Sequence, residues 1–204
     1  MITRSASAFT LIEVLVSSAL AILLLSLTVK LVSSGYRITH EEFERSATES
    51  KILILNNHFG RDLALTSSAG ISLSTTGESI VMQPLTLSDS TSVVYEDKFV
   101  AWMFQSASES VGRFESDGIP AVPFTGEAIR LDESLLTTIN TSSEFKLSRT
   151  FPKIEAFQVS NTPGVDHPFV GSHLKLMLSV ELDRARTRKD ITFEQTYQLR
   201  TSGL

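Results

Sequence analysis

Hydrophobic residues dominate the beginning of the chain and form one run from Phe9 to Val29. Glu13 is the only charged residue in this run, and the next charge is Lys30. A helix of about 20 apolar residues spans the hydrocarbon core of a bilayer. The pattern therefore predicts a membrane-spanning helix over residues 9–29, with one carboxylate near its start.

The helical pattern continues beyond the apolar run. Residues 41–51 are polar and rich in glutamate. Four apolar residues then recur at positions i, i+3, i+7 and i+11, which gives a helix one apolar face. This apolar stripe consists of Ile52, Leu55, Phe59 and Leu63. We expect it to pack against a sheet, and we expect the helix to end where Ser and Gly cluster over 66–70.

After Gly70 the hydrophobic period changes to two residues, which indicates β-strands. Apolar side chains point to both faces of the strand expected at 93–105, so we expect a central strand covered by the helix on one face. The alternative is an apolar patch that faces a partner. Near the end of the chain, 174–182 and 191–199 alternate strictly and predict an antiparallel hairpin. Further strands are expected at 79–83, 128–131 and 154–159.

Turn-forming residues separate the strands. We expect loops over 106–126 and 161–171, and a loop or short helix over 134–143. Four basic residues form the expected hairpin turn: Arg184, Arg186, Arg188 and Lys189. A solvated turn is the simplest interpretation, and contact with DNA, lipid headgroups or an acidic partner is the alternative. Together these elements predict an α+β fold, with a long helix packed on a mostly antiparallel sheet.

Composition and charge exclude some classes of protein. The formal net charge is −5, whereas a dedicated nucleic-acid-binding protein usually has a basic surface. The chain has no cysteine, so it has neither a disulfide framework nor a lipidated cysteine. A cleaved secretory signal would carry its small residues after the apolar run. Here the Ala6-Ser7-Ala8 triplet precedes the run, which argues against such a signal.

Signals for catalysis are absent from the sequence. The four histidines have no metal-ligand spacing, and no phosphate-binding or nucleophile motif occurs. The pair Asp166-His167 lies in a segment rich in Pro and Gly, where a solvated loop is the simpler interpretation than a site. We therefore expect no enzyme activity, no cofactor and no metal.

The start of the chain resembles a known signal. A short leader with Arg4 ends at Ala8, and Phe9-Thr10-Leu11-Ile12-Glu13 follows. This is similar to the class III signal of type IV pilins and type II secretion pseudopilins. The resemblance implies that a prepilin peptidase cuts between Ala8 and Phe9 and methylates the new amine of Phe9. The chain departs from the family in one position, because Ala8 stands where the family usually has Gly.

Glu13 has a physical role in this interpretation. Cleavage would create a positive amine at Phe9, and in a fibre of parallel helices that amine can meet Glu13 of a neighbouring subunit. A paired charge is tolerated in an apolar environment where an unpaired one is not. Such a pair would also set the axial stagger between subunits. The alternative is an ordinary signal anchor with an isolated glutamate.

A second resemblance concerns the subunit type. Arg61-Asp62-Leu63 near the helix end, and a last strand that ends in Tyr197-Gln198-Leu199-Arg200, resemble the GspJ- and PilW-type minor subunits. The alternative for the first motif is a surface Arg–Asp pair on an amphipathic helix. The absence of a C-terminal disulfide loop also favours a minor pilin or pseudopilin.

The resemblance implies four segments: a leader (1–8), a transmembrane and fibre-core helix (9–29), its periplasmic continuation (30–68) and an antiparallel sheet head (69–204). It implies a single-pass inner-membrane protein with its head in the periplasm, later placed near a fibre tip. The expected partners are the prepilin peptidase, other minor pilins or pseudopilins, and inner-membrane lipid; nucleic acid is not expected. Because Glu13 is retained, we expect a position below the outermost subunit.

Two other functions stay open from the sequence. One is a tip adhesin or DNA-uptake subunit whose head grips a ligand. The other is a signal-anchored periplasmic protein with no role in a fibre, which predicts that the leader stays attached.

Overall fold

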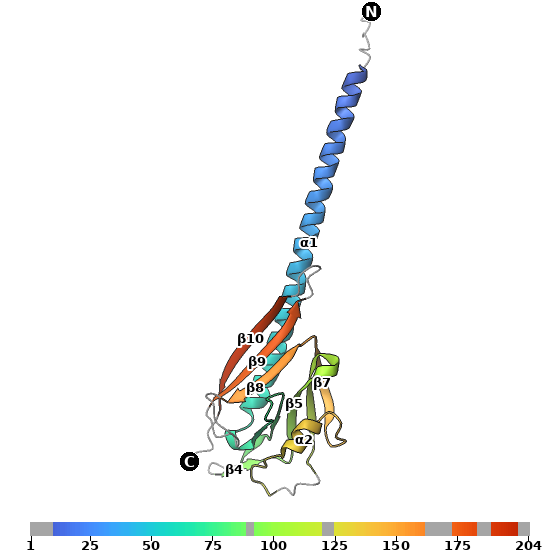
Figure 1. Cartoon of the computed structure of the whole chain (residues 1–204). Helices are drawn as coiled ribbons and strands as arrows, with labels where there is room; N and C mark the ends of the chain where they lie inside the picture. The colour runs from blue at the N-terminus through green and yellow to red at the C-terminus, as the bar shows by residue number, and fades with distance from the viewer. Residues whose placement is uncertain (1–9, 89–91, 120–124, 162–172, 183–188, 200–204) are drawn as a thin grey trace, which may run out of the picture. The chain divides into compact units, whose positions relative to one another are not determined.

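A computed structural model describes residues 10–88, 92–119, 125–161, 173–182 and 189–199. The chain divides into two compact units at the boundary between Ser46 and Ala47. The first helix, α1 (Leu11–Ala64), begins in one unit and ends in the other. This long helix and the antiparallel sheets confirm the predicted α+β class (Figure 1).

A five-stranded antiparallel sheet is the larger sheet of the second unit. Its strand order is β1-β2-β5-β6-β7. The strands are β1 (Ile71–Leu73), β2 (Ser79–Met82), β5 (Phe99–Gln105), β6 (Ser110–Ser116) and β7 (Lys146–Pro152). The predicted central position of the apolar strand is therefore confirmed, because β5 has a partner strand on each side.

Two smaller sheets complete the strands. A three-stranded antiparallel sheet has the order β10-β9-β8, and a hairpin pairs β3 with β4. Their bounds are β3 (Leu85–Ser88), β4 (Ser92–Tyr95), β8 (Ala156–Asn161), β9 (His173–Leu182) and β10 (Lys189–Gln198). The predicted hairpin is confirmed, with Leu178 opposite Phe193. Lys189, which was expected in the basic turn, is instead the first residue of β10 and pairs in register with Leu182. The other residues of that turn (184–188), the loop at 162–171 and the pair Asp166-His167 lie outside the described residues.

The apolar stripe of α1 is the centre of the main core. Ile52, Leu55, Phe59 and Leu63 are buried and join apolar side chains of the five-stranded and three-stranded sheets. Phe59 has edge contacts with Trp102 and Phe157, at centroid distances of 5.6 and 6.2 Å. The stripe therefore packs on sheets, as its spacing predicts.

A second apolar cluster covers the opposite face of β5. Phe99 and Ala101 of β5 pack there with Leu136 of a short helix, α2 (Glu133–Thr138). This helix begins one residue before the range 134–143, where a loop or short helix is expected, and ends inside that range. Both faces of β5 are thus core, and the alternative of a partner-facing apolar patch is wrong.

Three sequence predictions about strands are wrong. The single strand expected at 93–105 is two strands, β4 and β5, because three consecutive charged residues (96–98) form the connection. The loop expected at 106–126 contains β6, and β7 was not expected. No strand forms at 128–131, since the backbone N–H of Ile129 donates to Gln83 Oε1 (2.8 Å) and that of Leu131 to Ser72 Oγ (2.9 Å).

Other boundaries are close to those expected. Helix α1 ends at Ala64, before the Ser/Gly cluster, and a 3₁₀ turn follows at Ser68–Gly70. Strand β8 begins at Ala156, two residues after the expected start, and ends at Asn161.

Candidate functional site

A capping box begins α1 at the N-terminal motif. The backbone N–H and the hydroxyl of Thr10 both donate to Glu13 Oε2 at 3.0 Å, and the Glu13 N–H donates to Thr10 Oγ1 at 3.4 Å. These reciprocal bonds satisfy donors that a helix start leaves without an intrahelical partner. The Thr-x-x-Glu spacing was readable in the sequence, but the role of Thr10 was missed.

The other motif residues, Ala8 and Phe9, lie outside the described residues. Glu13 itself is exposed, and its described hydrogen bonds go to Thr10. The carboxylate is therefore held by its own helix turn in the isolated chain, and it also faces outward. That arrangement allows it to meet a group from another molecule.

The apolar first part of α1 is uncovered. Every residue from Thr10 to Phe43 is exposed, with Leu11 at 84% and Leu31 at 76%. By length and composition, α1 is a helix that can cross a membrane. The chain therefore carries a candidate membrane-spanning helix near its N-terminus.

Asp62 forms a buried polar centre in the second unit. Its carboxylate accepts hydrogen bonds from Trp102 Nε1 (3.0 Å), Arg113 Nε (2.7 Å) and Arg113 Nη2 (3.0 Å). The Asp62 side chain is only 7% exposed and that of Arg113 16%. This arrangement joins α1 to β5 and β6 through a two-pronged Arg–carboxylate pair.

The alternative of a surface Arg–Asp pair at Arg61-Asp62 is wrong. Asp62 is buried and pairs with Arg113, whereas Arg61 is exposed. The hydrogen bonds to Asp62 raise the pKa of the Arg113 guanidinium. Arg113 was missed because it lies in a segment that was expected to be a loop and that lacks an alternation of apolar and polar residues.

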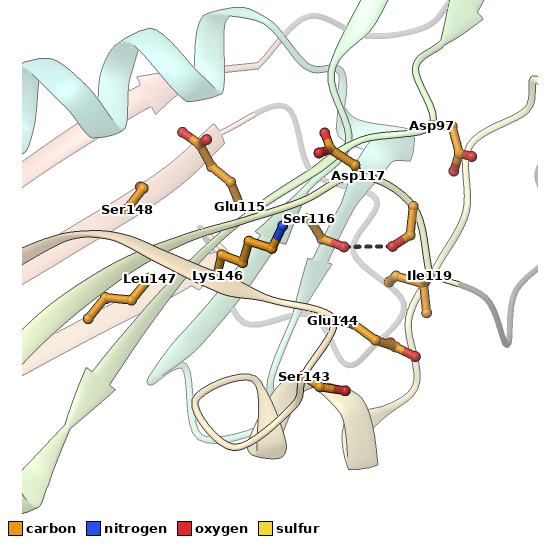
Figure 2. Close-up of a pocket in the computed structure, with 11 residues that line it drawn as sticks. Asp97, Glu115, Ser116, Asp117, Ile119, Ser143, Glu144, Lys146, Leu147 and Ser148 are labelled. Carbon is orange, nitrogen blue, oxygen red and sulfur yellow. Dashed lines mark hydrogen bonds between the residues drawn. The ribbon is translucent and has the colours of Figure 1, made fainter.

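A wide hollow of about 770 Å³ carries several carboxylates (Figure 2). Asp97, Asp117, Glu115 and Glu144 line it, together with Lys146. The hydroxyl of Ser116 donates to the Gly118 carbonyl at 2.6 Å and fixes the turn at its edge. In the described part of the chain, no group of three or more His, Cys, Asp or Glu residues is placed to hold a metal ion.

No family model, curated protein or solved structure matches this chain.

Proposed function

We propose that this chain is a minor pilin or pseudopilin, a structural subunit that primes or caps assembly of a type IV pilus or type II secretion pseudopilus near its tip. The observation that carries the proposal is the contrast within α1. Its first part is apolar, uncovered and marked by the single carboxylate Glu13, whereas Ile52–Leu63 is part of the core of the head. A helix with these two parts suits a subunit whose first segment is covered by other molecules.

The proposal requires that the apolar first part of α1 is surrounded by lipid before assembly and by neighbouring helices after assembly. Before assembly, residues 9–29 lie in the inner membrane with the head in the periplasm. After assembly, the same residues lie in the fibre core, and the methylated amine of Phe9 pairs with Glu13 of a neighbour. Glu13 can make this pair because it faces outward and is held by Thr10 alone among its described hydrogen-bond partners.

Intact-protein mass spectrometry tests the proposal. The membrane form is compared from cells with and without the prepilin peptidase. We expect loss of residues 1–8 and addition of one methyl group, both dependent on the peptidase. A full-length, unmethylated chain in both strains would contradict the proposal and support the signal-anchored protein.

Two substitutions separate processing from assembly. Ala8→Gly introduces the residue usual in the family, and we expect cleavage at least as complete as in the parent chain. Glu13→Gln removes the charge but keeps the shape, so we expect cleavage to persist while incorporation into fibres falls. Equal incorporation of the Glu13→Gln chain would contradict the proposed role of this carboxylate.

A further inference from the structure

A second hollow, of about 410 Å³, lies among the last turns of α1, β6 and β7. Its charged and titratable lining residues are His58, Arg61, Asp62, Arg113, Glu115 and Arg149. We call it the arginine hollow. It shares no residue with the N-terminal motif, and all of its residues belong to the unit that begins at Ala47.

Two arginines stand directly opposite each other in the arginine hollow. Arg113 of β6 pairs in register with Arg149 of β7. Like charges at opposed positions destabilise a sheet unless an anion compensates them. Asp62 compensates Arg113, whereas Arg149 Nη1 contacts the His58 Nε2 atom. The strand register shifts beside this pair, between Arg113 and Phe114, and irregularities of this kind often re-aim side chains at binding sites.

Positive charge is in excess in the arginine hollow. Three arginines face two carboxylates, so one positive charge remains when His58 is neutral. Arg61 and Arg149 are both exposed, and neither has a carboxylate partner among the described residues. The whole chain has a net charge of −5, so this local excess is opposite in sign to the rest of the protein.

We propose that the arginine hollow is a carboxylate-binding site, which receives a Glu or Asp side chain of a partner protein on Arg61 and Arg149. Guanidinium groups bind carboxylates through charge-assisted, often two-pronged hydrogen bonds. One carboxylate would neutralise the single excess positive charge of the arginine hollow. A phosphate dianion would leave an excess negative charge, close to the carboxylates of Asp62 and Glu115. The site does not depend on the proposed fibre function, because the head of an anchored protein would bind the same group.

His58 reports on occupancy of the arginine hollow. Burial is the largest cause that lowers the pKa of His58, and the positive charge of Arg149 is the next largest. The charges of Arg113 and Arg61 lower this pKa less, whereas the charge of Asp62 raises it. A bound carboxylate adds negative charge beside the ring, so it should raise the His58 pKa. By reciprocity, carboxylate affinity should rise as the pH falls and His58 becomes protonated.

The test uses the full chain in zwitterionic detergent, with isotope-labelled histidine and nuclear magnetic resonance. The His58 pKa is measured with a short peptide containing two Glu residues, with the same peptide carrying Gln, and with inorganic phosphate. We expect the Glu peptide alone to raise the pKa, with a dissociation constant on the order of millimolar, as suits one small polar contact. A shift with the Gln peptide as large as with the Glu peptide, or a response to phosphate only, would overturn the proposal.

Substitutions locate the binding. Arg61→Gln and Arg149→Gln should each weaken Glu-peptide binding about tenfold, because each removes a charge-assisted hydrogen bond. Lys98→Gln removes the same charge from an exposed position outside the arginine hollow and should leave binding unchanged. Fluorescence of Trp102 verifies that each variant is folded. Equal weakening in all three variants would mean general charge attraction and would refute the site.

Discussion

Replacing Asp62 with Ala should strongly destabilise the fold of the second unit. The carboxylate accepts three hydrogen bonds from two side chains, at 2.7–3.0 Å, in a position that is only 7% exposed. The substitution leaves the Trp102 N–H without its acceptor. It also leaves the Arg113 guanidinium, 16% exposed, without its two-pronged carboxylate partner.

The expected loss is about 3 kcal/mol in the free energy of unfolding. Removing one partner of a buried ion pair costs about 3–5 kcal/mol, because the other charge stays buried and unpaired. Arg113 keeps hydrogen bonds to Glu115 and to Ser148 Oγ, which places the loss at the lower end of that range.

Urea unfolding of the full chain in detergent measures this loss. Trp102 is the single tryptophan of the chain, so its fluorescence follows the surroundings of Asp62. Asp97→Ala is the matched control, because Asp97 is exposed and should change stability by less than about 0.5 kcal/mol. A loss below about 1 kcal/mol for Asp62→Ala would refute the reasoning that the pair is buried and coupled.

A double substitution separates the pair from its parts. Replacing both partners of a buried pair by apolar residues is far less harmful than removing one. We therefore expect Asp62→Leu with Arg113→Met to be more stable than Asp62→Leu alone. If the two losses simply add, the two side chains are not coupled and the structural assignment is wrong.

Two further predictions concern the second unit. Gly77 has φ +75°, and an added Cβ would lie 2.5 Å from the Val159 carbonyl oxygen, so Gly77→Ala should lower the free energy of unfolding in urea by more than about 2 kcal/mol. Gly126→Ala is the control, because Gly126 has a similar φ of +81° but an added Cβ would meet no atom closer than 4.0 Å. This control should lower the free energy of unfolding by only about 1–2 kcal/mol. Equal losses would contradict the steric argument. Burial raises the pKa of Tyr197 to about 12, so the folded state holds this proton more tightly than the unfolded chain and stability should fall as the pH rises from about 10 to about 12. Tyr197→Phe should remove that decline, and an unchanged slope would show that another group causes it.

The elements that were predicted from the sequence are those with a strong local period. The stripe of α1 repeats over three turns, and β9 alternates over ten residues, so neighbouring positions alone define their faces. In β10 the apolar face is carried by Ile191, Phe193 and Tyr197. Strands β6 and β7 lack this pattern. Most of β7 is exposed at the sheet edge, and β6 directs Arg113 towards the helix, where an apolar residue is expected.

The candidate site divides in the same way. Ala8, Phe9 and Glu13 were proposed from the resemblance of the N-terminal segment to a known signal. The capping role of Thr10 was missed, although its spacing to Glu13 is local. Asp62 was noticed from the sequence, but its partners were not, because Trp102 and Arg113 are 40 and 51 residues away. The arginine hollow likewise exists only after β6 and β7 pair and place Arg113 opposite Arg149.

Glu13 and Asp62 are two carboxylates on one helix, and their surroundings separate their roles. Asp62 receives three hydrogen bonds from distant side chains and is shielded from solvent, so its requirements are met within the chain. Glu13 is held by Thr10, one turn away, and otherwise faces outward from an apolar helix. In a bilayer or a fibre core, that local bond leaves the negative charge uncompensated, and such a charge is costly without a partner. Glu13, unlike Asp62, therefore needs a positively charged partner from outside the chain. In the proposed function, the amine created at Phe9 of a neighbouring subunit is that partner.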